Sequence, residues 1–320
     1  MKASWIALAA VVVTLSAQAA EKYPARPIRM VMPSSPGGAN DVVGRMVMQK
    51  VSEIMGLQIV VDNRGGAGGA IGAEIAAEGA PDGYTLLAAT YATHTMIPLL
   101  QKSIRYHPER DFAPIALFVV QYSMMSAHPS FQPSTVKELI ALAKAKPGTI
   151  NYGSAGPGST SHFTGLMFAK LAGIDITIVP YKGGGPLIIA LLAGETQFNF
   201  GPLPASVPHI RAGKLKAIAV SGPERSLAMP EVPTVAESGL PAFSQAAWVG
   251  LVAPAGTPRA ILDQLHAAVN RSLESTDLRQ QLIRIGAEPA PRSRAGFAQF
   301  LRNEYQRYAR LVNDLGLKPK

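Results

Sequence analysis

The chain contains no cysteine among its 320 residues, so it can form neither a disulfide nor a catalytic thiolate. Acidic residues are also few: 21 Asp and Glu stand against 30 Lys and Arg, which gives a formal net charge of +9. The basic residues are scattered, without a dense run or interleaved aromatic residues, so nucleic acid is not an expected partner. A small anionic ligand fits this charge balance better.

Long hydrophobic runs are absent after the first 20 residues. Lys2 precedes an apolar segment, residues 5–15, and the small residues Ala17 and Ala19 follow it. This segment is shorter than the ~20 residues that a membrane-spanning helix needs. We therefore predict a signal peptide over residues 1–19 and export to the periplasm. No cysteine follows that could carry a lipid anchor, and the remaining ~300 residues are enough for two domains.

Most catalytic signatures are also missing. The chain has no G-x-S-x-G motif and no P-loop, and Ile71 stands where a dinucleotide fingerprint would need glycine. The six histidines are dispersed and form no H-E-x-x-H motif, which argues against a zinc site. We expect no enzymatic activity, no cofactor and no metal.

Short apolar runs alternate with helical patterns in the first part of the chain. We predict strands at residues 28–32, 59–61 and 85–89, a helix from Asp41, and a helix at residues 70–77. Val43, Val47 and Val51 recur at helical spacing in the first of these helices. The resulting βαβαβ order predicts a parallel sheet covered by helices, and hence an α/β fold.

A second α/β series follows. A capping box from Thr135 to Glu138 opens a helix, and the chain is helical again from Pro258. Two apolar segments, residues 112–127 and 246–253, lie where the chain would pass between domains. If the C-terminal helices return to the first sheet, the first domain is discontinuous. The further elements predicted are strands at 150–153, 177–179, 197–200 and 217–220, and helices at 159–172, 186–193 and 205–212.

Five loops rich in glycine or small polar residues follow predicted strands: "MPSSPGGAND", "NRGGAGGAIG", "ATYATHTM", "YGSAGPGSTSH" and "VPYKGGGP". Each by itself could be a simple turn. Together they would meet at the carboxyl ends of parallel strands, where open α/β sheets bind ligands. Their backbone N–H groups and helix N-termini suit an anion. The loops supply hydrogen-bond donors but no recognisable pair of nucleophile and general base. This combination is more typical of a receptor than of an enzyme.

Three side chains keep alternative roles. Lys182 could supply a cation to a carboxylate or be solvated. Asp41 would repel an anion, so a cap or loop brace suits it better than a ligand contact. Trp248 could equally pack in the hinge or line a cleft.

The motifs "SPGGANDVVGR", "VDNRGGAGGAIGAEIAAEGAPDGYTLL", "INYGSAGPGSTSHFTG", "VPYKGGGP", "MPEVPTVAESGLP" and "WVGLVAPAGTP" occur in this order. Together they resemble the Bug proteins, which are TctC-type periplasmic substrate-binding components of tripartite tricarboxylate transporters. The resemblance implies a two-lobed, type II periplasmic binding protein fold, with two α/β domains joined by crossing strands. It places one domain at residues 20–121 plus 247–320 and the other at 122–246.

The resemblance further implies a monomer that binds a small carboxylate between its domains and delivers it to membrane permease subunits. The stretch 198–202, "FNFGP", departs from a Phe-Asp-Asn pattern that the family often has, and this puts the identity of the ligand in doubt. The alternatives are a hydrolase with a serine near His162, or a ligand-sensing partner of a membrane receptor. Apart from the brace Asp41, the resemblance assigns to ligand binding Ser35, Pro36, Gly37, Gly38, Ala39, Gly69, Ala70, Thr90, Tyr91, Ala92, Thr93, Ser154, Gly158, Ser159, Thr160, His162, Tyr181 and Lys182.

Overall fold

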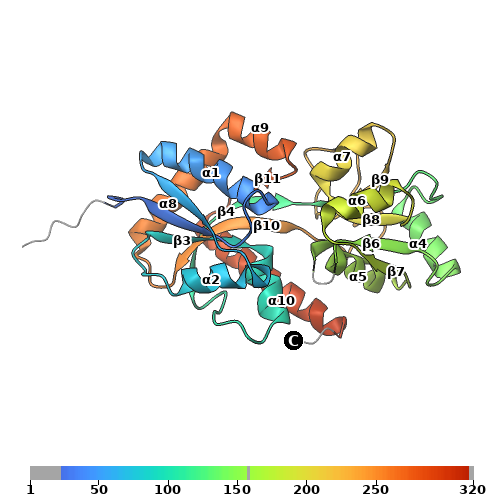
Figure 1. The fold of residues 1–320 in the computed structure, drawn as a ribbon, viewed down its shortest axis with the longest axis horizontal. Coiled ribbons are helices and arrows are strands. Elements are labelled where there is room, and N and C mark those ends of the chain that lie inside the picture. The colour runs from blue at the N-terminus through green and yellow to red at the C-terminus, as the bar shows by residue number, and fades with distance from the viewer. Residues whose placement is uncertain (1–22, 157–158, 317–320) are drawn as a thin grey trace, which may run out of the picture.

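The computed structural model describes residues 23–156 and 159–316, so the predicted signal peptide at 1–19 and Gly158 lie outside the described residues. The described chain forms two lobes, each built around its own sheet (Figure 1). No helix in these two ranges has the length and apolar character required to cross a bilayer.

The first sheet has six strands within the described ranges, in the order β11-β4-β10-β3-β1-β2. β1 pairs in parallel with β2 and β3, as predicted. The sheet as a whole is mixed, because β10 runs antiparallel to both β3 and β4. The strands are β1 (Ile28–Met32), β2 (Ile59–Asn63), β3 (Thr85–Thr90), β4 (Phe112–Gln121), β10 (Ala247–Pro254) and β11 (Glu288–Pro289).

Helices cover both faces of this sheet, and side-chain alternation along the strands explains why. In β1, Met30 packs into the core under α1 and α8, whereas its neighbour Val31 packs into the core under α2 and α10. Both faces are therefore buried, which makes the strands read as continuous apolar runs. The helices are α1 (Ala39–Met55), α2 (Ala70–Ala77), α8 (Arg259–Glu274), α9 (Thr276–Arg284) and α10 (Arg294–Asp314); a short π-helix η2 (Ala92–Met96) and α3 (Ile97–Leu100) follow β3.

The second sheet has the order β7-β6-β8-β5-β9 in the described part of the chain. β6 pairs in parallel with β7 and β8, and β5 runs antiparallel to β8 and β9. Aromatic side chains dominate its core, where Phe168 contacts Phe198, Phe200 and Phe243 edge to face. The strands are β5 (Ser123–Ala127), β6 (Asn151–Ser154), β7 (Thr177–Pro180), β8 (Phe198–Pro202) and β9 (Lys216–Val220); the helices are α4 (Val136–Ala145), α5 (Thr160–Ala172), α6 (Gly184–Leu192) and α7 (Leu203–Arg211).

The start of α4 shows how local sequence sets an element boundary. The Thr135 hydroxyl accepts a hydrogen bond from the Glu138 backbone N–H at 3.2 Å, so the predicted cap forms. The Glu138 carboxylate accepts from the N–H of Ser134 at 2.8 Å, one residue before the position of an ideal capping box.

The chain passes between the sheets twice. β4 ends at Gln121 in the first sheet and β5 begins at Ser123 in the second, and β10 returns the chain to the first sheet (Figure 1). Ser221 joins the two passages: its hydroxyl accepts from the N–H of Ser123 at 2.8 Å and donates to the Gln245 carbonyl at 2.7 Å. The predicted crossing segments therefore lie side by side and are hydrogen-bonded through one buried serine.

Helix α10 contacts both lobes. Its Tyr308 packs against Tyr91 of the first lobe, with ring centroids 5.0 Å apart, and against Phe163 of α5, with centroids 5.6 Å apart. Arg307 donates a hydrogen bond to the carbonyl of Ser244, which precedes β10. The C-terminal helix therefore spans the junction between the two lobes.

The first prediction concerns Gly250, in the middle of β10. A Cβ at this position would lie 2.8 Å from the Ala116 carbonyl oxygen and 2.5 Å from Phe297, so any larger residue must displace a strand or α10. We expect Gly250→Ala to lower the free energy of unfolding by about 1–3 kcal/mol. Thermal and urea unfolding measure this change.

Gly185 provides the matched control, because a Cβ there would meet no atom within 4 Å. Gly185→Ala should leave the unfolding midpoint unchanged or slightly raised. Equal midpoints for the two variants would contradict the close packing inferred at β10.

Candidate functional site

A cavity of about 350 Å³ lies between the two lobes, beside the crossing strands. The first lobe contributes the start of α1 and the end of β3. The second lobe contributes the starts of α5 and α6 and the end of β8. Residues 121–123 and Trp248, from the two crossing passages, complete the lining. The cavity therefore lies where motion of one lobe against the other would change its shape.

The first loop leads from β1 into α1, and Ala39 and Asn40 at its end line the cavity. Gly38 is the N-cap residue, with φ −68° and ψ 159°. The first hydrogen bond of the helix runs from the Val42 N–H to the Gly38 carbonyl. The preceding amides have no partner within the helix, as at any helix N-terminus, and they give this end of α1 a partial positive charge.

Asp41 holds this loop in place from behind. Its carboxylate is almost completely buried and accepts hydrogen bonds from the Gly37 N–H at 2.8 Å, Asn63 Nδ2 at 2.8 Å and Arg45 Nε at 3.0 Å. Burial by itself raises the pKa of the Asp41 carboxyl, but the hydrogen bonds from Arg45, Asn63 and Gly37 outweigh burial and lower this pKa. Asp41 is thus ionised and engaged with the protein itself.

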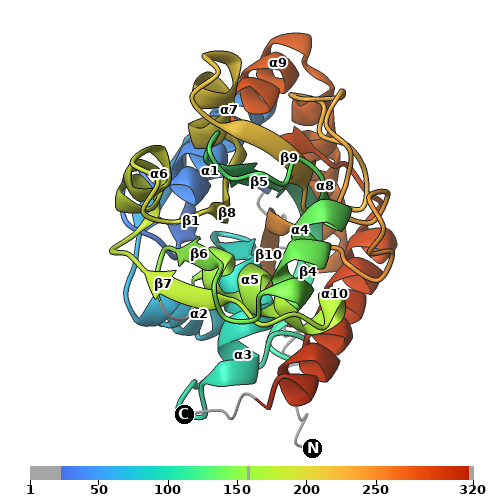
Figure 2. The same ribbon diagram turned by 90° about the vertical axis from the view of Figure 1, so that its right-hand side faces the viewer.

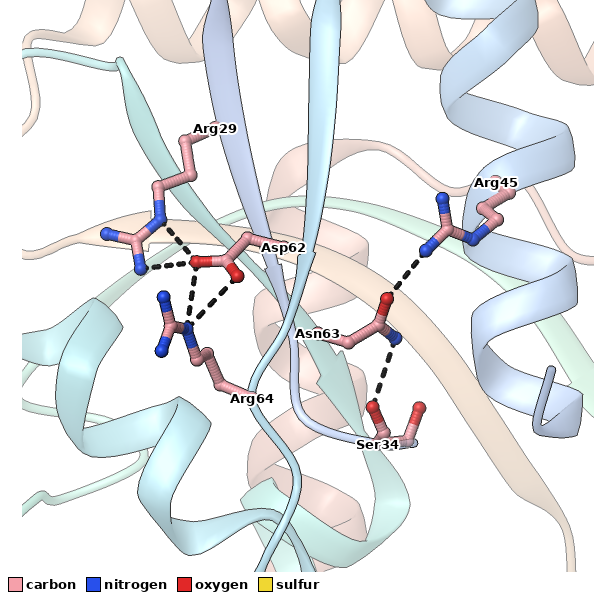
Figure 3. Close-up of polar contacts among 6 residues, drawn as sticks. All are labelled: Arg29, Ser34, Arg45, Asp62, Asn63 and Arg64. Atoms are coloured by element: carbon pink, nitrogen blue, oxygen red, sulfur yellow. Dashed lines mark hydrogen bonds and ion pairs between the residues drawn. The ribbon is translucent and has the colours of Figure 1, made fainter. Parts of the chain in front are cut away.

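Asn63, at the end of β2, extends the same network. Its Nδ2 donates to the Ser34 carbonyl at 3.0 Å, and its Oδ1 accepts from Arg45 at 2.6 Å (Figure 3). The neighbouring Asp62 points to the other side of β2, where it contacts Arg29 and Arg64 (Figure 3). Two consecutive polar residues therefore serve separate networks, because successive side chains of a strand point to opposite faces.

The matching loop of the second lobe leads from β6 into α5. Ser159 is the N-cap residue, with φ −71° and ψ 160°, and its hydroxyl accepts from the His162 N–H at 3.2 Å. The hydroxyl of Ser161 accepts from the Ala155 N–H at 2.8 Å. Ser159, Thr160 and Ser161 all line the cavity. A second helix N-terminus, from the other lobe, therefore faces the same space.

The end of β3 supplies a more rigid wall. The Thr90 N–H donates to the Thr93 hydroxyl at 3.1 Å, and the Thr93 N–H donates to the Thr90 hydroxyl at 3.2 Å. The Thr93 hydroxyl also lies 3.1 Å from Nδ1 of His94, whose pKa burial lowers to about 3. His94 is therefore neutral. Thr90 and Tyr91 reach the cavity, whereas Thr93 supports them from behind.

The structure gathers part of the predicted site. Gly158 lies outside the described residues. The predicted residues that line the cavity are Ala39, Thr90, Tyr91, Ala92, Ser159 and Thr160. The predicted residues that do not line it are Ser35, Pro36, Gly37, Gly38, Gly69, Ala70, Thr93, Ser154, His162, Tyr181 and Lys182.

Several of the residues outside the lining have a structural role. Gly69 packs against Pro33, where a Cβ would lie 2.8 Å from the Pro33 carbonyl oxygen. The Tyr181 hydroxyl donates to Glu195 at 3.1 Å, and Lys182 is exposed on the loop after β7. Ser154 is fully buried, and its carbonyl accepts from the Tyr181 N–H at 2.8 Å. These residues shape the loops that surround the cavity.

Sequence reasoning missed several lining residues. The lining residues on the two crossing passages could have been predicted from the sequence, because both passages were recognised there as segments between domains. Ile285 and Gly286 carry no such signal, since they reach the cavity only through the packing of α9 and the turn that follows it. The missed residues include Asn40, Gln121, Tyr122, Ser123, Pro202, Pro204, Ile285 and Gly286.

Trp248 combines the two roles that its sequence position allowed. It lies on the crossing strand β10 and packs edge to face against Phe297 and Phe300, with centroids 6.2 and 5.8 Å away. It also lines the cavity. Its indole N–H is buried and donates to no other described residue.

Two α/β lobes, two crossing passages and a cavity lined from both sides define the class of two-lobed solute-binding receptors. A metal centre is not part of this arrangement, since the described residues contain no group of three or more His, Cys, Asp or Glu side chains positioned to hold an ion.

Comparison with known proteins identifies the family. Residues 43–317 match the Tripartite tricarboxylate transporter family receptor, TctC, and the chain belongs to this family. It is 35% identical to protein BugT of Bordetella pertussis, and the match covers 94% of this chain and 93% of BugT. The predicted fold class and family are therefore confirmed.

Two solved structures of Rhodopseudomonas palustris proteins are similar over nearly their whole length. Rpa4515 with adipate is 32% identical, with a TM-score of 0.79, and the match covers 93% of this chain and 100% of that one. MatC (Rpa3494) with bound malate is 34% identical, with a TM-score of 0.74, and the match covers 91% of this chain and 100% of the MatC chain.

The second prediction concerns the brace Asp41. A carboxyl whose pKa is lowered by folding stabilises the fold above the unfolded-state pKa of about 4 and loses this contribution as the pH falls through the folded-state pKa. We expect Asp41→Asn to be less stable than the wild type by about 1–3 kcal/mol at pH 7. The difference in free energy of unfolding between the wild type and Asp41→Asn should become smaller at acidic pH. Urea unfolding at a series of pH values from 7 downward measures this difference.

Glu53→Gln is the control, because Glu53 pairs with Lys50 on the exposed face of α1. This variant should differ little from the wild type at any pH in the series. A stability gap for Asp41→Asn that stays constant with pH would show that its cost does not come from the ionised carboxylate.

Proposed function

We propose that this protein is a periplasmic receptor that binds a small carboxylate in the cavity between its lobes. It then delivers the ligand to the membrane permease of a tripartite tricarboxylate transporter. The observation that carries the proposal is that the N-termini of α1 and α5, which belong to different lobes, both line one cavity.

Each of these N-termini carries free backbone donors and about half a positive charge. A carboxylate between them accepts hydrogen bonds from both lobes, so it binds the closed arrangement more tightly than an open one. Differential binding of this kind shifts a two-state equilibrium towards closure. The adipate and malate in the related structures of Rpa4515 and MatC support a carboxylate as the ligand.

The hinge follows from the two crossing passages. We place one domain at residues 20–121 plus 247–320 and the other at 122–246. Sheet membership supports this division, because β5 to β9 form one sheet and the remaining strands form the other. Ser221 binds both passages, so rotation about this point would leave its hydrogen bonds intact.

The remaining features of the proposal are export, a monomeric state and the absence of catalysis. Export rests on the signal-like residues 1–19, and the periplasmic family supports it. Membership in a family of receptors also supports a role in binding. The described lining consists of hydroxyl, amide and apolar groups, which suit reversible binding better than group transfer.

The third prediction tests the backbone donors directly. Proline at the first position of a helix removes one N–H and suits the local φ. Gly38 and Ser159 already have the extended conformation that a residue before proline prefers. Ala39→Pro and Thr160→Pro should each weaken carboxylate binding about tenfold or more, with little change in the unfolding midpoint without ligand.

Ala39→Ser and Thr160→Ala keep the backbone N–H and serve as matched controls. A thermal-shift panel of mono-, di- and tricarboxylates on the wild type identifies a carboxylate that binds. Calorimetric titration with that carboxylate then compares its affinity for the proline variants and for their controls. The proposal fails if no carboxylate stabilises the wild type. It also fails if the proline variants bind as tightly as their controls.

A further inference from the structure

The segment that follows α9 contributes to the cavity and also contacts the second lobe. Ile285 and Gly286 line the cavity, and the chain then enters β11, which pairs antiparallel with β4 at the edge of the first sheet. Glu288 is the first residue of β11 and is almost completely buried, but it does not belong to the cavity lining. A buried carboxylate is stable only with hydrogen-bond donors around it.

The donors to Glu288 come from the second lobe. Its Oε1 accepts a hydrogen bond from the Ser226 hydroxyl at 2.6 Å and another from the Leu227 N–H at 2.9 Å. Ser226 is itself buried, and its hydroxyl also accepts from the Ala228 N–H at 3.2 Å. None of the ion pairs within the described ranges involves Glu288. A carboxylate of the first lobe therefore depends on the second lobe for its partners.

The turn that carries these donors is anchored in the second lobe. Met229 and Val232, which follow the turn, pack against side chains from β5, α7 and β9. The Met229 N–H also donates to the Ser226 carbonyl at 3.1 Å, which closes the turn. Rotation of the second lobe therefore moves both donors relative to Glu288, which stays with the first sheet.

Burial makes this contact sensitive to the loss of one donor. It raises the pKa of the Glu288 carboxyl, and the hydrogen bonds from Ser226 and Leu227 offset this only in part. A buried acceptor that loses its donor costs more free energy than the net gain of the hydrogen bond. Loss of one donor therefore disfavours the arrangement in which the carboxylate is buried, relative to one in which water reaches it.

Other contacts between the lobes lie on both sides of the crossing strands. Figure 1 and Figure 2 show α7 and α9 on one side of β4 and β10, and α5 and α10 on the other. Gly286 meets Pro204 on the first side, where a Cβ on Gly286 would lie 2.8 Å from the proline ring, and Tyr308 meets Phe163 on the second. Apolar contacts of this kind are non-directional. The hydrogen bonds to the Glu288 carboxylate are directional and charge-assisted, so they restrict the angle between the lobes more sharply.

We propose that Glu288 is a positioning residue for ligand binding. Its hydrogen bonds to Ser226 and Leu227 hold the second lobe at the angle of this structure, at which the N-termini of α1 and α5 line one cavity. Glu288 thereby raises the affinity for a carboxylate that it does not touch, because a larger fraction of the protein is already in the binding arrangement. This inference rests on the proposed function and adds a determinant of affinity outside the cavity.

Ser226→Ala tests the proposal, because it removes one donor and leaves the buried carboxylate in place. We expect small-angle scattering of the ligand-free chain without residues 1–19 to give a larger radius of gyration for this variant than for the wild type. Calorimetric titration with adipate, the ligand in the related Rpa4515 structure, should give a dissociation constant about tenfold higher for the variant.

Ser238→Ala is the matched control. The Ser238 hydroxyl donates to the Thr234 carbonyl at 2.7 Å within the second lobe, so this variant loses one hydrogen bond of the same loop without affecting Glu288. A purely structural role would lower the unfolding midpoint of both variants, whereas only Ser226→Ala should change the radius of gyration and the affinity. Equal radii and equal affinities for the two variants overturn the proposal.

Glu288→Gln completes the test. In this background Ser226→Ala should raise the dissociation constant less than in the wild type, because the hydroxyl no longer donates to a charged group. An equal effect in both backgrounds assigns the change to the loop alone and overturns the role of Glu288. If adipate does not bind the wild type, the scattering comparison of Ser226→Ala with Ser238→Ala decides on Glu288. Failure of every carboxylate in the thermal-shift panel overturns the proposed function itself and leaves that comparison valid.

Discussion

The pairing of β4 with β10 is the constraint on which the rest of the structure depends. These antiparallel strands lie side by side in the first sheet, and each is continuous with a passage to the second lobe. Ser221 then ties the passages together through Ser123 and Gln245. Because both passages are held at one place, the carboxyl ends of β1, β3 and β6 meet across one cavity. Two helices that are about 120 residues apart in sequence therefore face each other.

The charged side chains of the protein lie apart from the cavity in which we propose that the carboxylate binds. The chain carries a formal net charge of +9, and a positive net charge raises the local concentration of anions and speeds their encounter with the protein. The described cavity lining contains no charged side chain. Neutral donors can stabilise a carboxylate without the desolvation cost of burying a lysine or arginine beside it. Such a site is suited to a receptor that must release its ligand again.

Local patterns predicted most of the elements, because helical spacing and strand alternation record which faces are buried. Val43, Val47 and Val51 are buried as the pattern implied. The parallel pairing of the first three strands was predicted. The antiparallel insertion of β10 beside β3 was not predicted, because β10 lies more than 150 residues after β3 in the sequence. The loops after strands pointed to Ala39 and Ser159. The loop sequences could not distinguish residues that line the cavity from residues that support the loops, such as Gly69 and Thr93. That distinction depends on tertiary packing.

Hydrogen bonds and apolar contacts near the junction of the two lobes differ in how they respond to rotation. Ser123, Ser221 and Gln245 all lie in the second lobe, so the hydrogen bonds of Ser221 hold the two passages together on that side and turn with it. Between the lobes, Glu288 of β11 accepts hydrogen bonds from the Ser226 hydroxyl at 2.6 Å and from the Leu227 N–H at 2.9 Å. Tyr308 packs against the ring of Phe163, and Gly286 meets Pro204 without a hydrogen bond. Apolar contacts are non-directional and tolerate sliding. A change in the angle between the lobes therefore leaves the hydrogen bonds of Ser221 intact, lets the apolar contacts slide, and strains the hydrogen bonds that Glu288 accepts. A ligand that bridges α1 and α5 favours one angle over another by the difference in its affinity for the two arrangements.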